Sequence, residues 1–351
     1  MTPYTDEMSE GTYKAAVLVK PGEIELQERS VPDLGPGEAL VRVRFAGICG
    51  TDLALYSGLY AAALPLVPGH EFAGEVAAVG TGVDPGLVGS KVTGEINITC
   101  LSRGDEDPCP ACRRGFANHC LTRSVLGIAN HDGAFAELLK LPVRNVRPLP
   151  ETMPLYYGTF VEPLAAAIRI FELAPISAGE TVVVLGTGRL GVLTCKVASL
   201  KGARVVAVSH SAYKLQLAKK FGAHVLIDAG ETDVRQQILA LTGGLGAEVV
   251  VESTGTPDGL AEAVELVQPK GTISLKSTPG GANPGFPLTR AVVDEIRIQC
   301  SRCGPFGKAI RMMVRHRLEM DPLISHIYPL NDVRTALEAA RARFKIIMQA
   351  S

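Results

Sequence analysis

The pattern of apolar and polar positions first indicates a β-rich segment. Between residues 14 and 150, short stretches in which valines alternate with polar residues are separated by Gly- and Pro-rich breaks, as at 35–37. Alternation with a period of two is typical of strands that bury one face. The pattern predicts strands at 13–19, 38–45 and 71–79, and therefore a β-rich or barrel-like domain.

A different pattern follows, in which apolar runs alternate with helical stretches. The runs at 181–185 and 204–208 are separated by a glycine-rich turn and a helical stretch, and the same rhythm continues beyond them. Strands that alternate with helices predict a parallel sheet covered on both faces. The last part of the chain is mixed, and predicts amphipathic helices at 308–319 and 331–343 and a closing strand at 344–348.

Composition and charge exclude several classes of protein. The 351 residues are 46% hydrophobic and 20% charged, as in an average soluble globular protein, and their number fits two domains. A net charge of −1, from 35 basic and 36 acidic residues, disfavours a nucleic-acid partner. No apolar run approaches the ~18 residues of a membrane span, and the polar, acidic residues 1–14 do not resemble a signal peptide. We therefore expect a cytoplasmic protein with neither a nucleic-acid nor a membrane partner.

A glycine-rich turn follows the apolar run at 181–185 and opens a helical stretch. Gly186 permits a tight turn, Gly188 lets the backbone approach a pyrophosphate, and Gly191 lets the helix pack close to the strand. The helix N-terminus offers free N–H groups and a partial positive charge to phosphates. A purely structural turn is the alternative, but the strand–turn–helix–strand context favours dinucleotide binding. The residues expected to bind the cofactor here are Gly186, Thr187, Gly188, Arg189, Leu190 and Gly191.

Four cysteines lie close together between residues 100 and 120. Four thiolates on a compact loop suit a tetrahedral structural zinc ion, which contributes folding free energy. A long insert separates the first cysteine from the second, and its acidic residues 105–107 could supply the first ligand instead. We favour the cysteine because four soft sulfur ligands suit zinc best. The expected ligands are Cys100, Cys109, Cys112 and Cys120.

The other cysteines carry weaker signals. Cys300 and Cys303 have the spacing of a redox or metal half-site, but no second pair lies nearby in the sequence. We interpret them as core or surface cysteines. Cys195, on the helix after the glycine-rich turn, is predicted to be buried packing.

Three short segments, far apart in the sequence, hold residues suited to a catalytic zinc site. Such a site takes three protein ligands and keeps one position open. Cys49 in GICGTD, His70 in PGHE and Glu162 in FVEPL could supply the three ligands. Glu71 could supply a fourth. Each residue alone is weak evidence, because a lone histidine most often serves packing or lies at the surface.

Taken in this order, the dispersed ligands, the cysteine loop and the glycine-rich turn resemble the zinc-dependent medium-chain alcohol dehydrogenase family, which includes alcohol, polyol and threonine dehydrogenases. The resemblance covers residues 14–348, and the carboxylate at Glu162 is similar to the polyol and threonine branch. It implies an α/β protein in which a GroES-like catalytic domain (1–159 and 299–351) accompanies a Rossmann domain (160–298), with the active site in the cleft between them.

The resemblance also implies roles for the dispersed residues. Cys49, His70 and Glu162 would hold the catalytic zinc, and Glu71 would be a nearby carboxylate that can exchange onto the metal. Asp52 would hydrogen-bond the free nitrogen of His70, which fixes the imidazole tautomer.

Three further positions follow from the same resemblance. Thr51 would hydrogen-bond the substrate oxygen and pass its proton on, and Lys345 would contact the cofactor pyrophosphate. Many family members carry a histidine five residues after the first zinc cysteine, as the outer end of a proton relay. This chain has Ala54 there, so the route by which the proton leaves is open.

The activity implied is reversible oxidation of a secondary alcohol or polyol-like substrate, with hydride transfer to NADP or NAD. Zinc would lower the pKa of the bound hydroxyl, and Thr51 would relay its proton. A bulkier hydroxylated metabolite remains an alternative substrate. A zinc-free reductase of the same fold lacks the metal residues present here, and a zinc ribbon that binds nucleic acid is disfavoured by the balanced charge. A cofactor-binding regulator without turnover is disfavoured by the intact set of metal residues.

The end of the second apolar run predicts a preference for NADP over NAD. NAD-specific Rossmann folds usually place Asp or Glu there to accept from the ribose 2′-OH. This run ends in Ser209, His210 and Ser211, without a carboxylate. The hydroxyls can donate hydrogen bonds to a 2′-phosphate, and His210, when protonated, and Lys214 can offset its charge. A site that accepts both cofactors is the alternative.

The substrate itself is not readable from the sequence. We expect the pocket to be lined by residues 54–60, 95–97 and 300–306, where polar and apolar residues are mixed. Family members are usually dimers or tetramers, so a homodimer or homotetramer is expected.

Overall fold

The computed structural model describes residues 11–277 and 285–350, which form two compact units. The first unit comprises Met1–Glu162 and Ile310–Ser351, and the second comprises Pro163–Ala309. The second junction therefore lies later in the chain than the expected boundary at residue 299. The expectation of no signal peptide rests on residues 1–14, most of which lie outside the described residues. Within the described part of the chain, no helix is long and apolar enough to cross a membrane.

The first unit is rich in β-strands, as the alternating pattern predicts, and its strands pair antiparallel except for the last two in the chain, which are parallel to each other. The strands are β1 (Thr12–Lys20), β2 (Glu23–Ser30), β3 (Glu38–Gly47), β4 (Glu71–Val79), β5 (Lys91–Gly94), β6 (Asn97–Ile98), β7 (Ser124–Val125), β8 (Leu138–Pro142), β9 (Val146–Pro148), β16 (Ile324–Pro329) and β17 (Lys345–Gln349). Among the described residues, seven strands form one sheet in the order β16-β17-β3-β4-β5-β9, with β8 paired to β3. The sheet is thus centred on β3, which pairs antiparallel with β4, β8 and β17.

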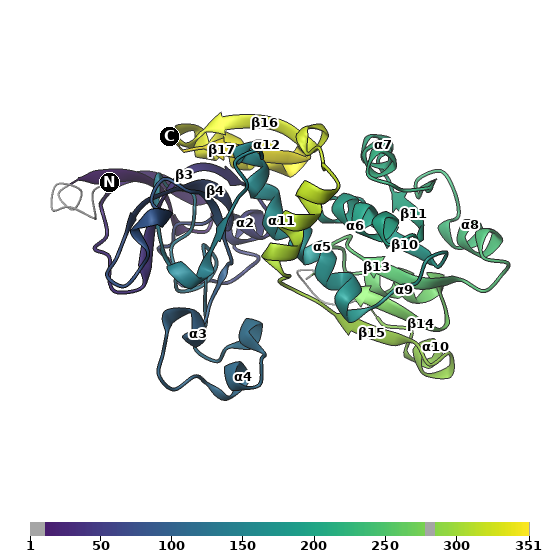
Figure 1. The fold of residues 1–351 in the computed structure, drawn as a ribbon. Coiled ribbons are helices and arrows are strands. Elements are labelled where there is room, and N and C mark those ends of the chain that lie inside the picture. Colours follow the sequence, from purple (N-terminus) through teal and green to yellow (C-terminus); the bar gives the residue numbers. More distant parts are fainter. Residues whose placement is uncertain (1–10, 278–284, 351) are drawn as a thin grey trace. The chain divides into compact units, whose positions relative to one another are not determined.

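Short helices connect these strands. They are α2 (Gly50–Ser57), η1 (Pro85–Leu87), α3 (Cys100–Arg103), α4 (Pro110–Arg113), η2 (Ala117–His119), η3 (Val143–Asn145), η4 (Leu155–Phe160), η5 (Asp321–Leu323), η6 (Leu330–Asp332) and α12 (Val333–Ala342). In Figure 1, α3 and α4 form a small lobe set apart from the sheet of this unit.

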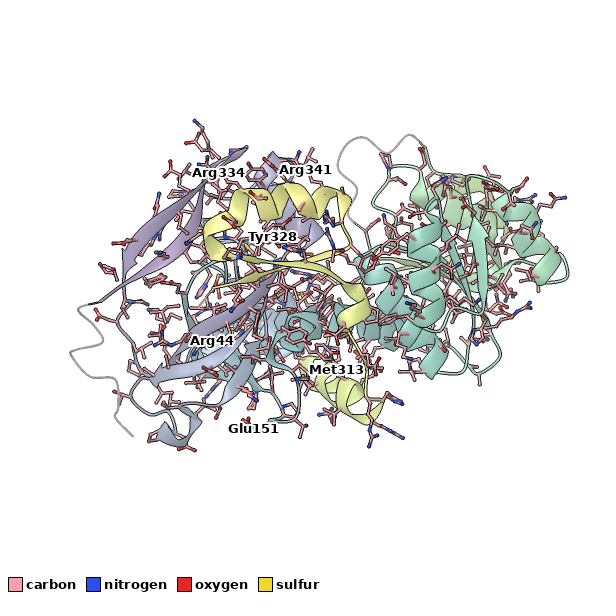
Figure 2. The ribbon with its side chains drawn as sticks, turned by 90° about the horizontal axis from the view of Figure 1, so that it is seen from above. Arg44, Glu151, Met313, Tyr328, Arg334 and Arg341 are labelled. Atoms are coloured by element: carbon pink, nitrogen blue, oxygen red, sulfur yellow. The ribbon has the colours of Figure 1, made fainter. Side chains whose placement is uncertain are left out.

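The C-terminal helix α12 contacts residues from the N-terminal part of the first unit. Arg334 and Arg341 lie on α12, above the strand that carries Tyr328 (Figure 2). The Nε of Arg334 donates to the carbonyl of Ile24 at 2.9 Å, and the guanidinium of Arg341 lies 6.0 Å from the ring centre of Tyr56. Strand β17, which follows α12 in the chain, joins the central sheet beside β3.

The second unit contains a parallel sheet. Its strands are β10 (Thr181–Leu185), β11 (Arg204–Ser209), β12 (Val225–Asp228), β13 (Ala247–Glu252), β14 (Val267–Leu275) and β15 (Arg297–Cys300). Its helices are α6 (Arg189–Leu200), α7 (Ala212–Lys220), α8 (Val234–Leu241), α9 (Gly259–Leu266) and α10 (Leu288–Val293); α5 (Val161–Leu173) and α11 (Phe306–Arg315) run across the unit boundaries. The order β12-β11-β10-β13-β14-β15, with every pair parallel, is that of the predicted doubly wound Rossmann fold (Figure 1).

Strands β10, β11 and β13 of this sheet are mostly apolar because both of their faces are buried. The side chains of Val183, Val206, Val250 and Ile273, one from each of four neighbouring strands, are fully buried in one cluster. Helix α6 packs on β10 and β11, α7 packs on β11 and β12, and α9 packs on β13 and β14. Strands covered on both faces have no solvated side and so need no polar alternation. The strand order reverses between β10 and β13, which is where such sheets bind ligands.

Candidate functional site

The pairing of β3 with β4 brings together three candidate ligands. Gly47, the last residue of β3, pairs with Glu71, the first residue of β4. Cys49 lies just beyond the end of β3, and His70 lies just before β4, so both stand at the same end of the pair. The thiol of Cys49, a ring nitrogen of His70 and a carboxylate oxygen of Glu71 all lie within 4.8 Å of one another. One soft sulfur, one imidazole and one carboxylate form a donor set that fits zinc.

Asp52 fixes the two segments that carry Cys49 and His70. Its side chain is 1% exposed, and its Oδ2 accepts the backbone N–H of Cys49 at 2.7 Å, which forms the start of α2. Its Oδ1 accepts the N–H of Gly69 at 3.2 Å and lies 3.3 Å from Nδ1 of His70, although that approach lacks the alignment of a hydrogen bond. One carboxylate therefore ties both segments together through their backbone N–H groups. The hydrogen bond from His70 to Asp52 that the sequence analysis expected stays a prediction.

The electrostatics of His70 reflect the same neighbours. Burial works to lower the pKa of His70, but the negative charges of Asp52 and Cys49 prevail and raise this pKa well above its ordinary value.

Thr51 lies beside the thiol. Its Oγ1 is 3.9 Å from Sγ of Cys49, in the first turn of α2. Ala54 lies on the same helix, one turn further along. The predicted relay residue is thus close to the predicted ligand.

Lys345 has a partner that the sequence analysis did not expect. Its ammonium pairs with the Oε2 of Glu71, and the two side chains are only 2% and 3% exposed. A side chain at Gly47 would lie 2.5 Å from the Nζ of Lys345 and 2.9 Å from the Oε2 of Glu71, so β3 passes close to the pair. The ring of Phe160 lies 5.5 Å from the same Nζ. Contact between Lys345 and a cofactor pyrophosphate stays a prediction.

Glu162 lies in the first turn of α5 and is half-buried. Among the described residues, the group with ligand atoms within 4.8 Å contains Glu71 and does not contain Glu162. The structure thus places Glu71, the carboxylate expected to exchange onto the metal, beside Cys49 and His70. The ligand role of Glu162 stays a prediction.

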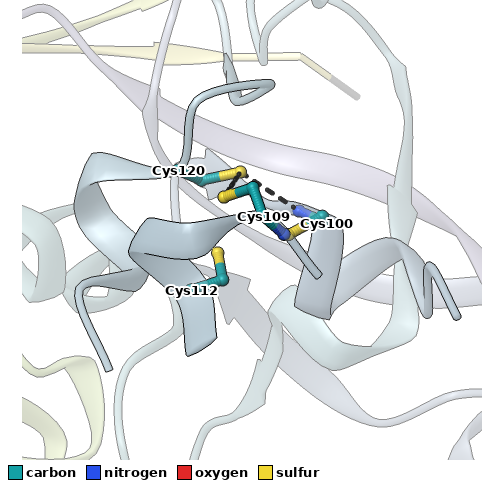
Figure 3. Close-up of side chains that lie close together, drawn as sticks. All are labelled: Cys100, Cys109, Cys112 and Cys120. Carbon is teal, nitrogen blue, oxygen red and sulfur yellow. Dashed lines mark hydrogen bonds between the residues drawn. The ribbon is translucent and has the colours of Figure 1, made fainter. Parts of the chain in front are cut away.

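The four loop cysteines converge (Figure 3). The sulfur atoms of Cys100, Cys109, Cys112 and Cys120 lie within 4.8 Å of one another. Of the competing acidic residues, Asp105 pairs with Arg103 at 2.8 Å and Asp107 with Arg113 at 2.6 Å, and the converging group contains none of the residues 105–107. The choice between Cys100 and these acids therefore favours Cys100.

Backbone N–H groups point at these sulfur atoms. Cys100 Sγ accepts from the N–H of Cys109 at 3.3 Å, Cys120 Sγ from that of Cys100 at 3.4 Å, and Cys109 Sγ from that of Leu121 at 3.5 Å. Although burial works to raise it, the donors from Cys100 and Thr122 lower the pKa of Cys120 to about 6. Burial and the neighbouring sulfurs raise the pKa of Cys112 to about 12. Backbone N–H groups aimed at three of the four sulfur atoms fit a structural zinc ion, which binds thiolates.

The remaining cysteines behave as packing or surface residues. Cys195 is 0% exposed on α6, and burial raises the pKa of its thiol to about 12. Cys303 is buried, whereas Cys300 is exposed at the end of β15. All of these cysteines are free thiols.

The glycine-rich turn has the predicted geometry. Gly186 has φ +91°, and a side chain there would lie 2.8 Å from the backbone of Thr254. Gly188 precedes the first residue of α6, and a Cβ there would meet nothing within 4 Å. A Cβ on Gly191 would collide with the carbonyl of Gly186. The turn is therefore closed on its protein side and open above the helix N-terminus, where an anion would bind.

The end of β11 holds a residue that the sequence analysis missed. Ser209 ends β11, Ser211 caps α7 by accepting the N–H of Lys214 at 3.4 Å, and His210 is exposed. The neighbouring strand places Asp228 in register with Ser209. The expectation that no carboxylate lies here holds for β11 itself but not for the adjacent strand. Sheet register would have revealed Asp228, and local sequence could not.

The expected pocket segments divide between the two units. Residues 54–60 and 95–97 belong to the first unit, and 300–306 to the second. Glu95 pairs with Arg147 at 3.0 Å.

Comparisons with known proteins agree with this geometry. Residues 35–151 match the family model described as alcohol dehydrogenase GroES-like domain, and residues 190–316 match the model described as zinc-binding dehydrogenase. The chain is 35% identical to an L-threonine 3-dehydrogenase of Pyrococcus horikoshii over 347 residues, covering 93% of this chain and 95% of that protein. It is 29% identical to a sorbitol dehydrogenase of Bacillus subtilis, covering 93% of each.

A solved structure gives the same result for the fold. A zinc-binding dehydrogenase from Sinorhizobium meliloti 1021, bound to NADP, superposes with a TM-score of 0.88 at 31% identity, covering 97% of this chain and 100% of that one.

Proposed function

Since the chain belongs to the zinc-dependent medium-chain alcohol dehydrogenase family, in its polyol and threonine branch, and is an oxidoreductase, we propose that it transfers a hydride between a secondary alcohol and a nicotinamide cofactor. The observation that carries the proposal is the convergence of Cys49, His70 and Glu71 beside Thr51. The secondary alcohols of threonine and sorbitol, named for two relatives, define the class of substrate.

A panel of alcohols tests this function. The panel contains simple primary and secondary alcohols, polyols and 2-amino-3-hydroxy acids, each offered with NADP and with NAD, and ketones offered with NADPH and with NADH. The change in absorbance of the reduced nicotinamide is followed. Turnover of at least one secondary alcohol is expected. If only primary alcohols turn over, the substrate class is wrong, and if no alcohol or ketone reacts, the function is wrong.

We propose two zinc sites. Cys100, Cys109, Cys112 and Cys120 would hold a structural ion, and Cys49 and His70 would hold a catalytic ion together with Glu162 or Glu71. When bound, the catalytic zinc supplies Lewis acidity to the alcohol or carbonyl oxygen. Metal analysis of protein purified without chelator is expected to give close to two zinc ions per chain, and a value near zero would contradict both sites.

The chain's own groups would prepare the site and move the proton. Asp52 holds the Cys49 and His70 segments together through its two oxygens. The Thr51 hydroxyl, beside the Cys49 thiol, would accept the proton of the alcohol and pass it on. Ala54 has no titratable group, so water would complete the path to solvent.

The ion pair with Lys345 affects whether Glu71 can bind the catalytic zinc. The buried ammonium compensates the Glu71 carboxylate and holds it away from solvent. Exchange of Glu71 onto the metal would require this pair to loosen. Glu162, which is half-buried, would then be the resident third ligand.

We propose that NADP is preferred over NAD. Ser209, His210 and Lys214 offer hydroxyl and basic groups at the end of β11, and the similar protein from Sinorhizobium meliloti was solved with NADP. Asp228 in the adjacent strand opposes this preference, because a carboxylate repels a 2′-phosphate. The test is catalytic efficiency with each cofactor at a fixed alcohol concentration. A clear NAD preference would contradict the roles of Ser209 and His210.

We also propose a homodimer or homotetramer. Strand β15 is an edge strand of the parallel sheet as described, and its residue Ile298 is 41% exposed. The neighbouring helix α10 exposes Leu288, Val292 and Val293 by 63%, 67% and 73%. An unpaired strand edge flanked by apolar side chains fits a second copy of this chain. Light scattering during size-exclusion chromatography should show an oligomer that Val293→Glu weakens, and a monomeric wild type would contradict the proposal.

A cytoplasmic location and the absence of a nucleic-acid partner are part of the same proposal. The free thiols of the described residues suit a reducing compartment. The net charge of −1 gives no basic excess to bind phosphates. Cell fractionation and a nucleic-acid binding assay across salt concentrations test the two statements.

A further inference from the structure

We propose that Glu252 is a positioning residue of the cofactor site, which holds the segments after β13 and β14 against the glycine-rich turn. The inference rests on the proposed function, because it concerns the same nicotinamide cofactor. Glu252 belongs to neither of the two groups of candidate zinc ligands.

Glu252 is the last residue of β13, and its side chain is 1% exposed. Its Oε1 accepts the backbone N–H of Thr254 at 2.8 Å and the hydroxyl of the same residue at 2.6 Å. Its Oε2 accepts the hydroxyl of Ser277, which follows β14. Burial of a carboxylate is costly unless donors replace its water, and here the donors come from two different loops. The carboxylate therefore links those loops.

The segment held by Glu252 forms the underside of the glycine-rich turn. A Cβ at Gly186 would lie 2.8 Å from both N and Cα of Thr254, so the two backbones are in direct contact. The hydroxyl of Ser253 donates to the carbonyl of Gly186 at 2.7 Å and to that of Leu185 at 3.1 Å. Movement of residues 253–254 would therefore move the turn that is open toward a pyrophosphate.

The start of α9 lies close to the Glu252 carboxylate, because its first residue is a glycine. A side chain at Gly259, the first residue of α9, would collide with Oε1 of Glu252 and with the hydroxyl of Thr254. The partial positive charge of a helix N-terminus favours an anion there. The hydroxyls of Thr254 and Thr256 lie 2.9 Å apart, which extends the network along the loop. The close approach leaves no space for the loop to shift independently of Glu252.

Lys276 continues the network to the next strand. Its backbone N–H donates to the carbonyl of Glu252 at 3.1 Å. Its Nζ donates to the carbonyls of Ser301 and Arg302 at 3.3 and 2.6 Å. Glu252, Ser253 and Lys276 thus connect the segments that follow β10, β13, β14 and β15, all at the carboxyl edge of the sheet. Open parallel sheets bind ligands at that edge.

The network gives the buried carboxylate a task that an apolar side chain of the same size could not perform. Apolar packing stabilises a core without fixing loop direction, whereas a satisfied polar network specifies one arrangement. A cofactor that meets prearranged loops does not have to order them on binding. The affinity for the cofactor should therefore depend on the bond between Glu252 and Ser277.

The test compares two serines on the same segment, in the zinc-containing enzyme. Ser277→Ala removes a donor to Glu252. Ser274→Ala is the matched control, because Ser274 is 0% exposed and its hydroxyl has no hydrogen-bond partner among the described residues. We expect Ser277→Ala to raise the dissociation constants of NADPH and NADH, measured by fluorescence, about tenfold, which corresponds to about 1.4 kcal/mol. Ser274→Ala should leave both constants unchanged.

Further readouts separate positioning from general stability. At saturating cofactor, Ser277→Ala should keep the wild-type kcat and KM for the alcohol, with the defect confined to KM for the cofactor. Ser277→Thr, which restores the hydroxyl, should recover the affinity. If Ser277→Ala does not fold, Thr254→Val, which removes the hydroxyl donor to Oε1, should give the same rise.

Equal cofactor affinity in Ser277→Ala and Ser274→Ala would overturn the inference while the proposed function stands. Failure of the wild type to bind either NADPH or NADH would overturn the proposed function itself, and with it the inference.

Discussion

The substitution Asp52→Asn tests how the catalytic ligands are held. The side chain keeps its shape, but only one of its two acceptor oxygens remains. The wild-type carboxylate accepts the N–H of Cys49 at 2.7 Å and the N–H of Gly69 at 3.2 Å from opposite oxygens. In the variant, the amide group must face one of these donors with its own N–H, so that donor is left buried and unpaired.

The magnitude follows from this geometry. A hydrogen bond to a charged group contributes about 1.5–3 kcal/mol, and an unsatisfied buried donor costs about 1–3 kcal/mol. Loss of one such bond at a side chain that is 1% exposed should lower the free energy of unfolding by about 2 kcal/mol. Loss of the carboxylate that holds the segments of Cys49 and His70 together should also weaken binding of the catalytic zinc by about 10–100-fold.

The assay measures both quantities on one preparation. Urea unfolding gives the stability change, and competition with a chromophoric chelator gives the zinc affinity. Asp84→Asn is the matched control, since Asp84 accepts the N–H of Gly86 at 2.9 Å in an exposed turn of the same unit. If Asp52→Asn matches Asp84→Asn in stability and in zinc affinity, then Asp52 does not hold the ligand segments and the reasoning is refuted.

Three further substitutions test the remaining assignments. Cys112→Ser should reduce stability and soluble yield and remove one zinc ion per chain, because binding of a structural zinc is folding free energy; retention of two ions would exclude this cysteine as a ligand. Glu162→Ala should leave the unfolding midpoint unchanged and remove most of the activity, whereas full activity would transfer the ligand role to Glu71. Thr51→Ala should lower kcat by about 10²–10⁴-fold where chemistry limits the rate, with Thr51→Ser close to wild type; unchanged kcat in Thr51→Ala would place the start of the proton relay elsewhere.

Much of the fold could be predicted because its signals are local. The strands at 71–79 and 181–185 are confirmed residue for residue as β4 and β10, since period-two alternation and a buried apolar run are each legible within a few residues. The helix predicted at 308–319 is wrong at its ends. It runs from Phe306 to Arg315, and the backbone turns at Arg317, which has φ +46°.

The site was predictable only in part, for a physical reason. Cys49, His70 and the loop cysteines indicate metal binding through their residue types and spacings alone. The pairing of Lys345 with Glu71 joins residues 274 positions apart and depends on β17 lying beside β3. Asp228 and the Glu252 network depend in the same way on which strands are neighbours. Tertiary register, rather than local chemistry, decides such contacts.

The most direct test of the central claim is turnover of the alcohol panel by three forms of the wild-type protein: as purified, depleted of zinc by a chelator, and reloaded with zinc. A zinc-dependent secondary alcohol dehydrogenase should reduce the nicotinamide cofactor as purified, lose this activity when the catalytic zinc is removed, and regain it on reloading. Undiminished turnover in protein shown by metal analysis to lack zinc would contradict the account.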